Sequence, residues 1–83
     1  MVRCIKIFQD EKKVIYDYYT EAHMNTEPGR FEYNLISGNP TCLKLSFDEK
    51  EHNKMYYVAS INRIDRYIAN NQPLPDDFTV SWY

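Results

Sequence analysis

The sequence has few of the residues that interrupt or crosslink small proteins. Its 83 residues include two Gly, four Pro and two Cys, which argues against a disordered low-complexity chain and against a disulfide-rich scaffold. Cys4 and Cys42 lie far apart in the chain and do not form a metal-type pair. We expect both to be reduced and to act as small hydrophobic side chains. A disulfide between the two strands that carry them stays open as the alternative.

An excess of one charge and long apolar runs are also missing. The net charge is -2 at pH 7, so the chain has no cationic field that would collect nucleic acid or anionic lipid. No window approaches the ~20 apolar residues of a membrane-spanning helix, and the first residues carry charges where a signal peptide would be apolar. We therefore expect a cytoplasmic protein that does not bind membranes.

Motifs of catalysis and metal binding are absent as well. The sequence contains no nucleophile elbow, no phosphate-binding glycine loop, no zinc-binding helix motif and no paired cysteines. His23 and His52 have no second histidine or cysteine at ligand spacing, and we interpret both as solvated. The sequence thus predicts a protein that is not an enzyme and has no cofactor or metal. A small enzyme or ligand binder built around His23 is the alternative with the fewest supporting residues.

Alternation of apolar and polar residues predicts five strands, over residues 2–9, 13–20, 31–35, 43–47 and 78–83. A helix is expected to begin near Ser46, which has capping-box spacing to Glu49, and to end near Asn70 before two prolines. The expected fold is an α+β single domain spanning residues 1–83. In this fold a small, mainly antiparallel sheet, in chain order β-β-β-β-α-β, carries one amphipathic helix on one face. The long link from the fourth to the fifth strand suits a parallel crossover.

The expected core collects the inward residues of these elements. It consists of Ile5, Ile7, Val14, Tyr16, Phe31, Leu35, Leu43, Leu45, Phe47, Tyr57, Val58, Ile61, Ile64, Ile68, Phe78, Val80 and Trp82.

Tyrosine is what the sequence has in excess, with eight residues in 83. The second strand carries aromatic or apolar side chains on both faces, so covering either face with the helix leaves an apolar patch on the other. Tyrosine is common in protein interfaces because its rigid ring has a polar tip. We therefore expect an inhibitor, immunity or regulatory factor that binds a protein partner or forms a homodimer. The expected contact residues are Ile15, Tyr18, Tyr19, Tyr33 and Tyr56. The alternative, that the tyrosines only fill a small core, stays equally open.

A second hypothesis is a nucleic-acid-binding regulator that uses the polar side of the helix. The candidate residues are Lys54, Asn62, Arg63, Arg66 and Asn70, with exposed strand tyrosines available to stack on bases. Asp65 interrupts this basic strip, and the chain as a whole is acidic. Both facts favour a solvated helix face whose charges pair locally.

Overall fold

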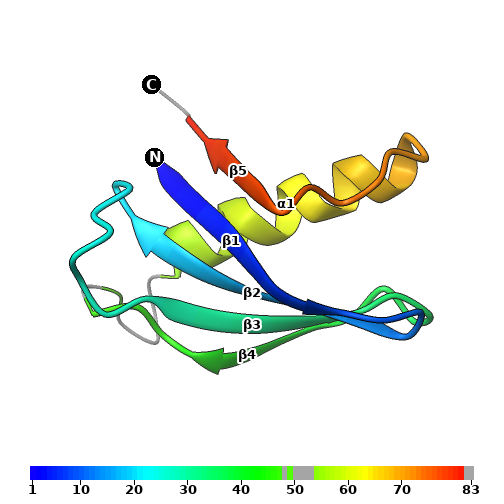
Figure 1. Ribbon diagram of the computed structural model, residues 1–83, viewed down its shortest axis with the longest axis horizontal. Coiled ribbons are helices and arrows are strands. Elements are labelled where there is room, and N and C mark those ends of the chain that lie inside the picture. The colour runs from blue at the N-terminus through cyan, green and yellow to red at the C-terminus, as the bar shows by residue number, and fades with distance from the viewer. Residues whose placement is uncertain (48, 50–53, 82–83) are drawn as a thin grey trace.

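A five-stranded sheet with one helix across one face is the architecture of this protein (Figure 1). The computed structural model describes residues 1–47, 49 and 54–81. The strands are β1 (Val2–Gln9), β2 (Lys13–Thr20), β3 (Gly29–Asn34), β4 (Pro40–Lys44) and β5 (Asp77–Val80), and the helix is α1 (Met55–Ala69). The α+β fold and the element order expected from the sequence are confirmed.

The strands lie in the order β4-β3-β2-β1-β5, and every neighbouring pair is antiparallel. The chain builds β1 to β4 as successive hairpins, then crosses the sheet through α1 and adds β5 at the opposite edge, beside β1 (Figure 1). It follows that β4 and β5 run in the same direction, as a crossover requires, although three strands separate them.

The strand order removes the disulfide alternative. Cys4 lies in β1 and Cys42 in β4, and β2 and β3 separate these strands. At roughly 4.8 Å per strand the two cysteines are ~14 Å apart, which is beyond the reach of a disulfide. Both are free cysteines: Cys4 is buried and Cys42 is half-buried. The Sγ of Cys4 donates a hydrogen bond to Ser60 Oγ at 3.3 Å.

The core lies between the sheet and α1. Its buried apolar residues are Val2, Cys4, Val14, Tyr16, Tyr18, Phe31, Tyr33, Ile61, Ile64, Phe78 and Val80. In β2 the residues at even positions face the helix, so Ile15 and Tyr19 lie on the other face of the sheet.

Part of the expected core is wrong, because five of its residues are exposed: Ile7, Leu43, Phe47, Val58 and Ile68. The pairing of β1 with β2 shifts between Lys6 and Phe8, so Ile7 falls outside the regular alternation. A second shift, between β3 and β4, leaves Leu43 without an opposite residue. Expected core residues at Ile5, Leu35, Leu45 and Tyr57 are half-buried. Trp82, also expected in the core, lies outside the described residues.

The helix begins later than its sequence signals suggest. Ser46 and Glu49 form a turn, with Glu49 N donating to Ser46 O at 3.2 Å, and α1 begins only at Met55. The expected capping box is therefore wrong. A negative charge, that of Glu49, nevertheless lies at the N-terminus of α1, where the helix dipole favours it. Oε2 of Glu49 accepts hydrogen bonds from the backbone N–H groups of Tyr56 at 2.7 Å and Tyr57 at 3.4 Å.

Candidate functional site

Two of the expected contact tyrosines belong to the core, so their prediction as surface residues is wrong. The rings of Tyr18 and Tyr33 are buried against α1 because both stand at helix-facing positions of their strands. The hydroxyl of Tyr18 donates to Glu49 Oε1 at 2.6 Å, and that of Tyr33 donates to Asp65 Oδ1. Both hydroxyls reach the polar rim of the helix layer, which lets a large ring stay buried while its polar tip is satisfied.

Ionisation of these core tyrosines is disfavoured. Burial raises the pKa of Tyr33 to about 12, and the hydrogen bond to Asp65 adds to the shift. Burial also raises the pKa of Tyr18, reinforced by Glu49, and burial is the main cause of the raised pKa of Tyr16. The hydroxyl of Tyr16 donates to a backbone carbonyl, Pro75 O, at 2.6 Å. These tyrosines therefore bridge the sheet and the segments around the helix as neutral donors.

The remaining predicted contact residues lie at two different places. Tyr56 is half-buried at the start of α1, where its hydroxyl donates to Glu21 Oε2 at 2.9 Å. Ile15 and Tyr19 are half-buried on the sheet face opposite the helix. The structure therefore brings only Ile15 and Tyr19 together on one surface.

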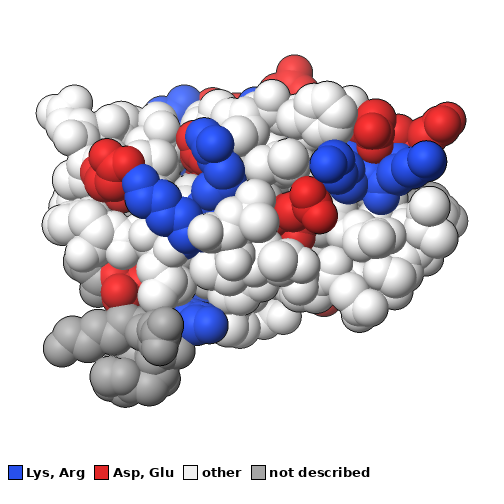
Figure 2. Space-filling view, turned by 90° about the horizontal axis from the view of Figure 1, so that it is seen from below, with Lys and Arg blue, Asp and Glu red and all other residues white. Residues whose placement is uncertain are grey.

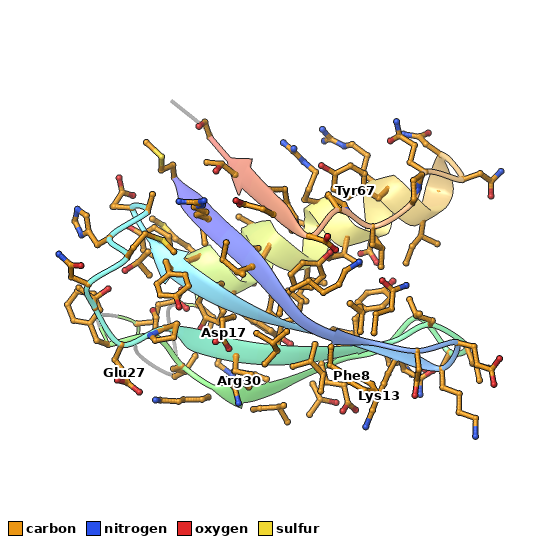
Figure 3. All side chains as sticks on the ribbon, viewed as in Figure 1. Phe8, Lys13, Asp17, Glu27, Arg30 and Tyr67 are labelled. Carbon is orange, nitrogen blue, oxygen red and sulfur yellow. The ribbon has the colours of Figure 1, made fainter. Side chains whose placement is uncertain are left out.

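We call the sheet surface opposite α1 the open face. Strand register and alternation assign its side chains: Asp77 and Thr79 from β5, Arg3, Ile5 and Phe8 from β1, Lys13, Ile15, Asp17 and Tyr19 from β2, Arg30 and Glu32 from β3, and Lys44 from β4. Figure 3 shows Phe8, Lys13, Asp17 and Arg30 on the side of the ribbon away from the helix, with Tyr67 on the helix side.

Charged residues of the open face pair with one another across neighbouring strands. Arg30 holds Asp17 with two bonds, Nε to Oδ1 at 2.7 Å and Nη2 to Oδ2 at 3.2 Å. Arg3 holds Asp77 in the same way, at 3.0 and 2.6 Å. Two lysines make further pairs, Lys13 with Glu32 of β3 and Lys44 with Glu27 of the loop before β3. Figure 2 shows acidic and basic side chains side by side on this face, so the face carries no field of one sign.

One of these ion pairs could have been expected from the sequence of β2. Asp17 is the one acidic residue in a strand of aromatic and apolar side chains, and it is only 8% exposed. A carboxylate buried this far needs a charged partner, and Arg30 stands directly opposite in β3. The partner could not be named from the sequence because the register of β2 against β3 decides it.

Apolar side chains occupy the spaces between these pairs. Ile5, Ile15 and Tyr19 are half-buried, whereas Phe8 is 45% exposed and Leu43 is 51% exposed. The ammonium of Lys13 lies 5.8 Å from the centre of the Phe8 ring. Leu43 borders a hollow of about 530 Å³ that the Asp17–Arg30 pair also lines. The open face is therefore a mixed surface, with apolar residues set among neutralised charges.

The expected nucleic-acid residues are only partly brought together. Asn62, Arg63 and Arg66 line one groove beside β5, whereas Lys54 and Asn70 lie just beyond the two ends of α1. Within the described residues no ion pair joins Arg63 or Arg66 to a carboxylate, so the expected local pairing of charges is not seen there. Asp65 lies one and two positions from these arginines, so it points to another side of the helix.

The sequence also led to expectations about the histidines, metal-ligand clusters and membrane-spanning segments. His23 is exposed in the loop between β2 and β3, and His52 lies outside the described residues. In the part of the chain that the structure describes, no three His, Cys, Asp or Glu side chains cluster as metal ligands. None of the described helical residues forms a segment long and apolar enough to span a membrane. Comparison with known proteins finds no significant match to a family model, a curated protein or a solved structure.

Proposed function

We propose that this protein is a non-enzymatic binding protein that works through the open face, and that a second copy of the chain occupies this face. The observation that carries the proposal is the exposure of Phe8 and Leu43 among half-buried Ile5, Ile15 and Tyr19, on a sheet face that α1 does not cover. Exposed apolar surface of this kind on a small protein marks an interaction site.

The charge pattern favours a second copy as the occupant. Each charge of the open face described above has an opposite charge beside it, on the same face or, for Lys44, in the adjoining loop. A two-fold interface brings the same patch of two subunits together, so a patch with a net charge would face an equal charge of the same sign. A face that is neutral over short distances avoids that penalty, and its apolar residues then decide the association.

The size of the face is also sufficient. The molecule measures 30 × 24 × 22 Å, so one face offers on the order of 700 Å², close to the ~800 Å² that each partner contributes to a stable interface. A dimer formed in this way would cover Tyr19 and leave α1 accessible. We further propose a cytoplasmic location, which suits the free thiols of Cys4 and Cys42.

Sedimentation over a wide concentration range tests this proposal. We expect the wild-type chain to form a dimer at micromolar concentration and Tyr19→Glu and Phe8→Glu to be monomeric, because each variant places an unpaired charge in the interface. Ile36→Glu is the matched control, since Ile36 is 76% exposed in the turn between β3 and β4. This control should remain dimeric. A monomeric wild-type chain, or loss of the dimer in the Ile36 variant alone, would contradict self-association through the open face.

A further inference from the structure

A groove runs between the first turns of α1 and the end of β5, on the opposite side of the molecule from the β4 edge. It has a volume of about 470 Å³ and is lined by Met55, Val58, Ala59, Asn62, Arg63, Arg66, Val80 and Ser81. Met55 and Val58 are 48% and 49% exposed. The groove therefore combines exposed apolar side chains with two arginines.

The charge of this groove differs from that of the open face. On the open face Arg3 and Arg30 are each held by a carboxylate. Arg63 and Arg66 make no ion pair with any described residue, and the hydroxyl of Tyr33 engages the nearby Asp65. The groove consequently presents positive charge that the described part of the chain does not neutralise.

The backbone of β5 adds, along the same edge, hydrogen-bonding groups that pair with no strand of the described chain. Lys6 N donates to Asp76 O at 2.8 Å, so these two residues form a hydrogen-bonded pair of the antiparallel ladder. Such pairs alternate with non-bonded ones, which means that Phe78 bonds toward β1. The N–H and C=O groups of Asp77 and Thr79 point away from β1, and β5 is the last strand of the sheet on this side.

We propose that this groove and the free edge of β5 bind an extended protein segment that carries both acidic and apolar side chains. The segment pairs with the outward backbone groups of β5 as an added strand. Its apolar side chains contact Met55 and Val58, and its carboxylates bond to Arg63 and Arg66, whose planar guanidinium groups suit two-point recognition of carboxylates. The side chains that line the groove lie outside the open face, so one dimer would present the groove twice.

A protein segment fits the groove better than nucleic acid does. Two arginines neutralise few phosphates, and the chain as a whole carries a net charge of -2. The aliphatic side chains of Met55 and Val58 offer no aromatic surface on which a base could stack. The free strand edge, in contrast, matches the backbone of a peptide directly.

Fluorescence anisotropy with a labelled peptide of alternating Glu and Val tests this proposal in the full chain. We expect saturable binding of this peptide and none of its counterpart with Lys in place of Glu. Arg63→Gln and Arg66→Gln should each weaken binding about tenfold, whereas Lys12→Gln, at an exposed cation in the turn between β1 and β2, should have no effect.

A backbone variant separates strand addition from simple charge attraction. Thr79→Pro removes an N–H that points away from β1, which an edge strand tolerates, so the thermal midpoint should change little while peptide binding falls. Failure of the Glu-Val peptide to bind, equal binding of the Lys peptide, or tighter binding of a DNA oligonucleotide with a steep salt dependence would each overturn the proposal. The sedimentation of the chain should be unchanged in the Arg63→Gln and Arg66→Gln variants, whose side chains line the groove and not the open face, which keeps this result distinct from the test of the open face.

Discussion

Alkaline unfolding should expose the structural role of the core tyrosines. The rings of Tyr16, Tyr18 and Tyr33 are buried, and each hydroxyl donates to an acceptor at the edge of the core. Loss of the phenolic proton removes the donor and leaves a negative charge in a desolvated place, for two of the three beside a carboxylate. The folded protein therefore resists this ionisation, which is why the pKa values of all three are raised.

The sign of the pH effect follows from the unfolded chain, in which tyrosine ionises near pH 10. Below that pH both states keep the proton and the stabilisation is complete. Above it the unfolded chain releases protons first, so the free energy of unfolding falls by ~1.4 kcal/mol per pH unit for each tyrosine until the folded pKa is reached, about 12 for Tyr33. Burial raises the pKa of the Cys4 thiol to about 12. Its ionisation also lowers the free energy of unfolding, and this effect begins about one pH unit below that of the tyrosines.

The three tyrosines together remove ~4 kcal/mol per pH unit, and a domain of this size has a total stability of ~4–12 kcal/mol. We therefore expect cooperative unfolding within about one to three pH units above 10. Circular dichroism and tyrosinate absorbance, recorded as the pH is raised, measure the two events together. The absorbance of the core tyrosines should appear together with the loss of structure.

Tyr33→Phe provides the matched control, because it keeps the buried ring and removes one hydroxyl. Its free energy of unfolding, measured by urea at a series of alkaline pH values, should fall with pH about one third less steeply than that of the wild-type chain. Exposed Asp65 can turn to water in this variant. Full ionisation of all tyrosines while the circular dichroism is still native would refute the reasoning, since it would show that the core hydroxyls are open to water.

Three further predictions concern the packing that supports the two proposed surfaces. Ile64→Ala should lower the free energy of unfolding by ~2–5 kcal/mol, measured by urea denaturation, because Ile64 is fully buried under the sheet; a loss below ~1 kcal/mol would contradict the packing of α1. Gly29→Ala should cost ~1–3 kcal/mol, because its new methyl group would overlap the ring of Tyr18, and an unchanged thermal midpoint would speak against this contact. Asp17→Asn should cost ~1–2 kcal/mol by weakening the bonds to Arg30, and this difference should shrink at high salt if charge is its cause.

The elements with regular spacing were predictable from the sequence. Alternation in β2 and the helical spacing of Ile61 and Ile64 predicted a sheet covered by one helix, because burial of one stripe leaves few other arrangements. The sequence did not decide which face of β2 packs against the helix, because Tyr16 on one face and Tyr19 on the other are equally suitable for a core. The structure selects the alternative that buries Tyr16 against the helix.

Features that depend on irregular backbone were not predictable. The shift between Lys6 and Phe8 in β1 exposes Ile7, and no residue in that strand marks it. Glu49 accepts hydrogen bonds from backbone N–H groups of α1 although it precedes the helix by several residues, so the local spacing of a capping box gave the wrong start. Both features arise from tertiary contacts, which local sequence patterns do not encode.

The placement of the tyrosine hydroxyls also explains why the two proposed surfaces differ in charge. Asp65 accepts a hydrogen bond from Tyr33 on another side of α1 than the arginines of the groove, so it does not neutralise them. On the open face the acidic residues stand on strands directly opposite the basic ones, as Asp17 does with Arg30. A helix separates neighbouring charges around its axis, whereas adjacent strands bring opposite residues within reach. The same composition thus yields a neutral sheet face, the proposed dimer surface, and a positive groove, the proposed site for an acidic segment.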